Sequence, residues 1–177
     1  MIARIIVLCI ALVGSVSIAH AQTTPAPSAG ARRAVGVFLQ TCLNFAGSTL
    51  GLRDFLKKQD IPELNPQGRA IFVRDHVGIG FDASNNVGRL AIVSEDNGVC
   101  SIFTDQGNLA QIIPLIEVLN KTLNLQLQKT GGKETGSVHA RYYTVTMKDH
   151  TYLLVISESP NPNSTIQAAM TLSPQSN

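Results

Sequence analysis

The sequence contains no tryptophan, and only 5% of its 177 residues are aromatic. This scarcity argues against a surface that stacks the bases of single-stranded nucleic acid. Charged residues make up only 15% of the chain, which excludes a coiled coil, a class rich in Glu, Lys and Arg. Hydrophobic residues make up 44%, which excludes a disordered chain. The composition therefore predicts a globular domain with its own core.

A targeting pattern occupies the first residues. Arg4 precedes an apolar run from Ile5 to about Val13, and small residues follow as far as Ala19-His20-Ala21. This order predicts a signal peptide over residues 1–21, because the apolar run is shorter than the about 20 residues of a membrane-spanning helix. Removal of Arg4 lowers the formal net charge from +2 to +1. We therefore expect neither nucleic acid nor, after cleavage, a membrane as a partner.

The cysteines point to a structural bond rather than to catalysis. Cys9 falls within the leader, which leaves Cys42 and Cys100 in an exported chain. An even pair in such a chain predicts one disulfide. The alternative is a nucleophilic Cys42 assisted by a histidine. Cys42 falls late in its predicted helix, however, where the helix dipole raises the pKa of a thiol, so the disulfide is favoured.

The remaining chain divides into three parts. Residues 22–31 lack bulky apolar side chains, which predicts a disordered linker. We expect a single domain over residues 32–172 and a flexible tail over residues 173–177. Apolar periodicity predicts three helices, over residues 32–46, 48–59 and 107–125. Gly47 separates the first two, and Ser48 is the expected N-cap of the second. Pro114 lies within the third, where it predicts either a kink or a late start.

Alternating patterns predict an antiparallel sheet. A four-strand meander is expected over 70–73, 77–81, 89–94 and 99–104, followed by a hairpin over 138–147 and 152–157 and a last strand over 166–172. Asn97-Gly98 favours positive φ at both central positions of a tight turn, and residues 131–136 are an expected exposed loop. Short connections between strands predict the α+β class, with helices packed on one face of the sheet.

Motifs of catalysis are scarce. The sequence has no G-x-S-x-G elbow and no phosphate-binding glycine loop, and we expect no cofactor. Asp75-His76 and Asp149-His150 both fall in predicted turns, and two imidazoles with two carboxylates would ligate zinc if those turns met. Turns also recruit Asp for their own hydrogen bonds, so these four residues are weak metal candidates.

Three tyrosines are candidates for an interface. Tyr142, Tyr143 and Tyr152 belong to the predicted last hairpin. Consecutive side chains on a strand point to opposite faces, so one of Tyr142 and Tyr143 is expected to be exposed. An exposed tyrosine is a good interface anchor, whereas ordinary cross-strand packing is the alternative for all three.

Three segments of the chain resemble small exported bacterial proteins of uncharacterised families. These segments are Val37-Phe38-Leu39-Gln40-Thr41-Cys42, Asn97-Gly98-Val99-Cys100 and Ile166-Gln167-Ala168-Ala169-Met170-Thr171. The resemblance spans most of the chain after the leader, and it implies no particular activity and no catalytic residue.

Together these observations favour a non-enzymatic, protein-binding module that is periplasmic or secreted. Its expected partner is another exported or envelope protein, as for an inhibitor or an immunity protein. The alternative is a small cell-envelope hydrolase that uses Cys42 with a histidine, or a metal at the Asp-His turns. A third hypothesis is the carriage of a small ligand in a pocket between the helices and the sheet.

Overall fold

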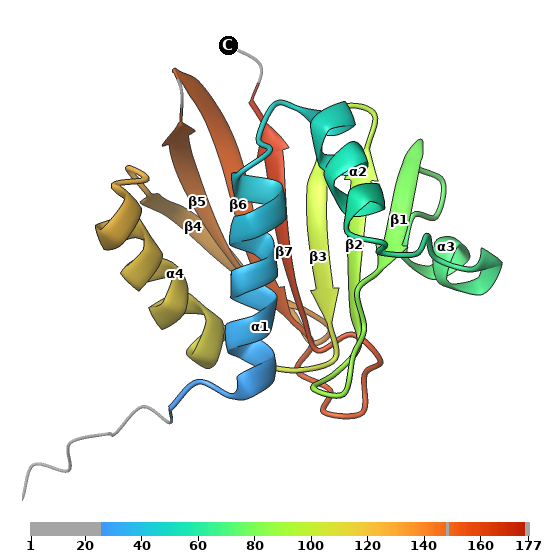
Figure 1. The fold of residues 1–177 in the computed structure, drawn as a ribbon. Helices are drawn as coiled ribbons and strands as arrows, with labels where there is room; N and C mark the ends of the chain where they lie inside the picture. Colours follow the sequence, from blue (N-terminus) through green and yellow to red (C-terminus); the bar gives the residue numbers. More distant parts are fainter. Residues whose placement is uncertain (1–25, 148, 176–177) are drawn as a thin grey trace, which may run out of the picture.

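The computed structural model describes residues 26–147 and 149–175, and within them it shows four α-helices, one π-helical turn and seven strands (Figure 1). The elements follow one another as α1 (Ala29–Phe38), η1 (Leu39–Leu43), α2 (Thr49–Lys58), α3 (Pro66–Phe72), β1 (Gly78–Asp82), β2 (Leu90–Glu95), β3 (Cys100–Thr104), α4 (Leu109–Leu123), β4 (Gln128–Glu134), β5 (His139–Met147), β6 (His150–Glu158) and β7 (Ala168–Pro174). The mixed class predicted from the sequence is confirmed.

All seven strands form one antiparallel sheet in the order β1-β2-β3-β7-β6-β5-β4 (Figure 1). The last strand, β7, lies between β3 and β6, so it joins the N-terminal strands to the C-terminal hairpin. This placement makes the middle of the sheet depend on pairing between residues far apart in the sequence, such as Ile102 with Met170.

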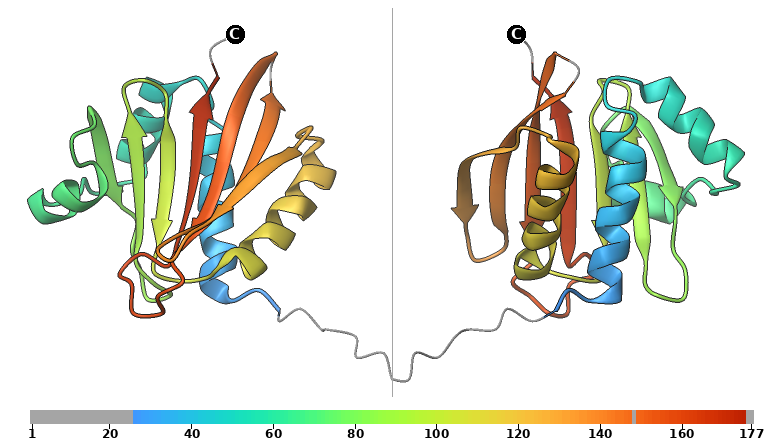
Figure 2. Two further views of the ribbon diagram at one scale, coloured as in Figure 1. Left: turned by 180° about the vertical axis from the view of Figure 1, so that it is seen from behind. Right: turned by 60° about the vertical axis from the view of Figure 1, so that its left-hand side comes forward.

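Helices α1, α2 and α4 lie side by side over one face of the sheet, and the core fills the space between them (Figure 2). From α1 come Ala31, Ala34 and Phe38, which are fully buried. Alternate residues of the strands meet them, including Ile102 and Ile156. The period of two in the strands and of 3.6 in the helices thus explains which side chains form this core.

The predicted strand over residues 70–73 is wrong, because this segment belongs to α3 and the residue after it. The side chain of Asn65 accepts a hydrogen bond of 2.8 Å from the backbone N–H of Gly68, and Pro66 occupies the first turn. Both are helix-start signals. They outweigh the strand preference of Ile71 and Phe72.

The N-terminal meander therefore has three strands, β1, β2 and β3, instead of four. Its β2–β3 turn also differs from the predicted type, because only Gly98 has a positive φ, of 89°. The N–H of Gly98 donates to the carbonyl of Glu95 at 3.1 Å, which places Asp96 and Asn97 at the centre of the turn. A turn of this kind followed by a left-handed glycine is the common three-residue hairpin loop.

Several predicted boundaries shift. Helix α1 begins at Ala29, capped by the Ser28 side chain, and Ala31 is fully buried, so the predicted linker over 22–31 ends earlier than expected. Strand β4 includes Gly131 and extends to Glu134, where a loop was predicted, and β7 includes Ser173, which was assigned to the tail. The predicted signal peptide, residues 1–21, lies outside the described residues.

Helix α4 begins at Leu109 and continues through Pro114 to Leu123. The side chain of Asn108 accepts from the N–H of Gln111 at 3.0 Å and caps the first turn. No helix within residues 26–147 and 149–175 is long and apolar enough to cross a membrane.

Candidate binding face

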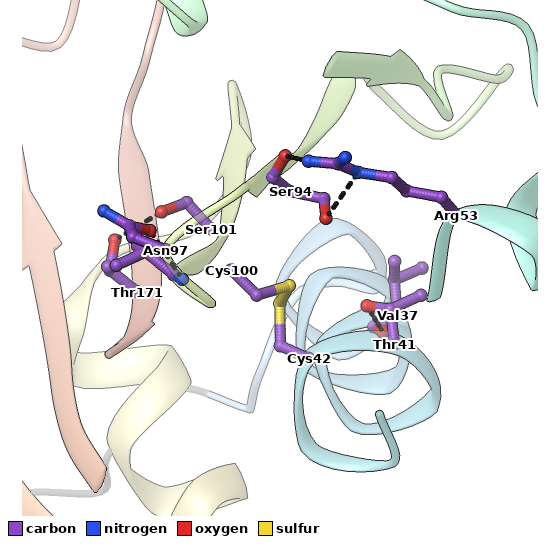
Figure 3. Close-up of a disulfide and its surroundings, with 10 residues drawn as sticks. Val37, Thr41, Cys42, Arg53, Ser94, Asn97, Cys100, Ser101 and Thr171 are labelled. Atoms are coloured by element: carbon purple, nitrogen blue, oxygen red, sulfur yellow. Dashed lines mark hydrogen bonds between the residues drawn. A yellow bond between two sulfur atoms is a disulfide. The ribbon is translucent and has the colours of Figure 1, made fainter. Parts of the chain in front are cut away.

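The two cysteines form the predicted disulfide (Figure 3). Cys42 belongs to η1, Cys100 is the first residue of β3, and their Cα atoms lie 5.4 Å apart. Both residues are buried among the core side chains. The bond fastens the end of the first helical segment to the sheet and leaves Cys42 without a free thiol. It is consistent with an oxidising, exported location.

The two Asp-His turns do not form a metal site. His76 lies just before β1, and His150 is the first residue of β6, four strand intervals away across the sheet. At about 4.8 Å for each interval, the separation is on the order of 19 Å. Nδ1 of His76 instead pairs with Glu95 at 3.1 Å. Among the described residues no three His, Cys, Asp or Glu side chains gather closely enough to hold a metal ion.

The three tyrosines separate onto the two faces of the sheet. Tyr143 and Tyr152 are each only 5% exposed and pack into the core beneath the helices. Their burial overturns the prediction that they are interface residues and supports the alternative of ordinary packing. Tyr142 points to the other face, opposite Val155 on β6, and is partly exposed. Of the three candidates, Tyr142 is the one placed to touch a partner.

We define the open face as the side chains of β3, β7, β6 and β5 that point away from α1, α2 and α4. The strand registers assign them as Ser101, Phe103, Ala169, Thr171, Ser173, Thr151, Leu153, Val155, Ser157, Ala140, Tyr142, Thr144 and Thr146. Seen from behind, β7, β6 and β5 carry no helix over this side, and α3 reaches only Phe103 of β3 at its border (Figure 2). None of the side chains of the open face is charged. An apolar centre at Tyr142, Leu153 and Val155 is bordered by hydroxyl groups.

Helix α3 covers the opposite end of the same side of the sheet. A Cβ added to Gly80 of β1 would lie 2.5 Å from a methyl carbon of Leu64, so the segment that leads into α3 rests on this side. The rings of Phe72 in α3 and Phe103 in β3 lie 5.3 Å apart between centroids. A cavity of about 270 Å³ lies beside this aromatic pair, and we call it the α3 cavity. Its lining includes Ile71, Phe72, Ala91, Phe103, Asp82 and Arg89.

An arginine from the helical layer holds the loop that borders the α3 cavity. Arg33 of α1 donates hydrogen bonds to the backbone carbonyls of Ala83 and Gly88. Burial lowers the pKa of the Arg33 guanidinium, and the nearby carboxylate of Asp105 opposes this effect. The rim of the cavity is thereby tied through the loop to the main core.

Reasoning from the sequence missed both the open face and the α3 cavity as sites. The alternation that exposes either Tyr142 or Tyr143 was visible in the sequence. The choice between them depends on which face the helices cover. The sequence does not reveal the α3 cavity, because its pattern predicts a strand over residues 70–73, where the structure has α3.

Comparison of the chain with protein-family models, with curated proteins and with solved structures finds no match.

Proposed function

We propose that this protein is an exported, non-enzymatic binding module that contacts another exported or envelope protein through the open face. One observation carries the proposal: the open face extends over four strands without a charged side chain. The core of a protein interface is depleted in charge and enriched in aromatic residues, and Tyr142 supplies the aromatic anchor.

The contrast with an ordinary solvated sheet supports this proposal. The solvent-facing side of an antiparallel sheet normally carries polar and charged side chains in alternation with buried ones. Here Tyr142 faces Val155, and Leu153 lies diagonally beside them, so apolar atoms occupy the centre of the face. Ser101 and Thr171 bond to each other at 2.9 Å at one side of this centre. The hydroxyl groups supply hydrogen bonds without the desolvation cost of a charge.

The disulfide supports a binding role over the hydrolase alternative. A hydrolase that used Cys42 as its nucleophile would need a free thiol, and Cys42 is bonded to Cys100. A hydrolase that used a metal at the Asp-His turns would need those turns to meet, and four strand intervals separate them. The bond also holds the helical layer on the sheet, which keeps the open face in one shape before binding.

The proposal is tested by site-specific photocrosslinking in the organism that exports the protein. A benzophenone amino acid replaces Tyr142 in one variant and Thr171 in a second. As a matched control it replaces Lys58, which is exposed on α2 in the helical layer. We expect a discrete adduct from both positions on the open face and none from Lys58. The partner is then purified and its affinity measured.

A second substitution distinguishes a specific contact from adventitious capture. Val155→Arg places a charge at the centre of the open face and is expected to weaken binding of the purified partner by at least about tenfold. Lys58→Glu, on the other side of the molecule, should leave the affinity unchanged. Adducts only from Lys58, an adduct with the mass of two copies of this chain, or an unchanged affinity of Val155→Arg would each refute the proposal.

A further inference from the structure

We infer that the α3 cavity binds a small organic cation, a molecule with one ring and an ammonium group. The inference does not rest on the proposed protein partner, because it depends on the cavity at the β1–β3 end of the sheet and not on Tyr142, and the two sites share only Phe103. Its volume of about 270 Å³ is that of roughly nine water molecules, which suits a single ring with a short side chain.

The wall of the cavity is apolar and aromatic. Phe72 and Phe103 meet at a centroid distance of 5.3 Å with their planes tilted by 44°, and Ala91 lies beside Phe103 in the neighbouring strand. Ile71 is 48% exposed although it is apolar, because α3 buries none of its own residues. A ring inserted beside these residues would remove apolar surface from water on both molecules.

The charged side chains that line the cavity differ in whether a group of opposite charge pairs with them. Asp105 accepts from the backbone N–H of Arg89 at 2.9 Å and from its Nε at 3.0 Å. It also lies in the field of Arg33. These contacts balance the charge of Asp105 with that of Arg89, whose side chain is largely exposed, so Asp105 is not offered to a cationic ligand.

Asp82 is the lining carboxylate that lacks a cation. One of its oxygens accepts from the backbone N–H of Ser84 at 3.0 Å. Across residues 26–147 and 149–175, no Lys, Arg or His nitrogen lies within 4.0 Å of it. The register places Asp82 opposite Ala91, on the side of the sheet that faces the cavity. An ammonium group would therefore pair with Asp82 while the ring lies against Phe72 and Phe103.

The test compares three phenyl compounds of similar size that differ in charge. They are 2-phenylethylammonium, the neutral 2-phenylethanol and the anionic phenylacetate, each titrated into the purified protein while backbone amide signals are followed by NMR. We expect 2-phenylethylammonium to give saturable shifts in α3 and around residues 82–91. We expect 2-phenylethanol to bind more weakly at the same place and phenylacetate to bind most weakly of the three.

Two variants separate the charged contact from the apolar one. Asp82→Asn keeps an oxygen that accepts from the N–H of Ser84. It is expected to weaken the affinity for the ammonium probe by at least about fivefold, without changing the affinity for 2-phenylethanol. Phe72→Ala is expected to weaken the affinity for both probes. Asp54→Asn, an exposed carboxylate on α2, is the matched control and should change neither. Shifts that map elsewhere, phenylacetate binding as tightly as the ammonium probe, or an unchanged affinity of Asp82→Asn would overturn the inference.

Discussion

Ser101 on β3 and Thr171 on β7 share a hydroxyl hydrogen bond of 2.9 Å across the middle of the sheet. The two residues face each other in the register of these strands, and Ser101 is only 4% exposed. Their contact lies where the N-terminal strands meet the C-terminal ones. Loss of this hydrogen bond therefore tests how much the pairing of β3 with β7 contributes to the stability of the open face.

Removal of both partners of this pair should cost less than the sum of the two single removals. Ser101→Ala is expected to lower the free energy of unfolding by about 1 kcal/mol, because the hydroxyl of Thr171 loses its partner beside a buried position. The double variant with Thr171→Val should be more stable than the sum of the single changes predicts, by about 0.5–1 kcal/mol. Urea denaturation measures all four proteins, and Thr146→Val, exposed on the same face, is the control. Strict additivity would show that the bond contributes nothing.

The disulfide makes a second prediction about stability. Cys42 and Cys100 are separated by 58 positions, and the chain-entropy model gives roughly 4 kcal/mol for closing such a loop. Replacement of both by alanine is expected to lower the free energy of unfolding by about 2–4 kcal/mol. Dithiothreitol should lower the urea midpoint of the natural protein and leave that of the double variant unchanged. Equal midpoints with and without the bond would contradict this account.

The parts of the fold that local chemistry dictates were predictable. The disulfide pairing follows from a cysteine count, and α2 begins directly after Ser48 as predicted, although the Ser48 side chain makes no capping hydrogen bond. The strand predicted over 70–73 was wrong because Asn65 and Pro66, which begin α3, lie upstream of the β-branched and aromatic residues that favoured a strand. Here a helix-start signal decided between two conformations that composition left open.

Features that depend on pairing between segments far apart in the chain could not be predicted from the sequence. Nothing near Ala168 indicates that β7 enters the sheet between β3 and β6 instead of extending its edge. The resulting strand order puts four intervals between His76 and His150, which excludes the hypothetical metal site. The period of two predicted that Tyr142 and Tyr143 face opposite ways, but only the helical layer decides which of them is exposed.

A carboxylate at the start of α4 supports a third prediction. Oε2 of Glu158 accepts from the backbone N–H of Leu109 at 2.7 Å, and Oε1 lies 3.1 Å from Nδ1 of His139. A negative charge at a helix N-terminus is favourable, so Glu158→Gln is expected to cost about 0.5–1 kcal/mol. Glu158→Ala also removes the acceptor and should cost more, with faster hydrogen exchange at Leu109. Glu117→Gln, exposed in the middle of α4, is the control, and equal effects at the two positions would contradict a local role for Glu158.

The stability of the protein should fall at alkaline pH because of Tyr143. Burial raises the pKa of the Tyr143 phenol above its ordinary value of 10.0, the charge of Glu117 raises it further, and Arg141 opposes both. A raised pKa means that the folded state holds the proton more tightly than the unfolded state does. The contribution to stability is therefore complete below pH 10 and is lost as the pH rises through the folded pKa.

Tyr143→Phe removes this titrating group, and the ring remains to fill the same place in the core. The free energies of unfolding of the two proteins should therefore differ by a constant amount below pH 10. Above that pH the variant should lose stability less steeply than the natural protein, because it has no buried phenol to ionise. Urea denaturation between pH 8 and pH 11.5, with phenolate absorbance followed in parallel, measures both effects. Identical slopes above pH 10 would show that the Tyr143 phenol ionises as readily in the folded chain as in the unfolded one.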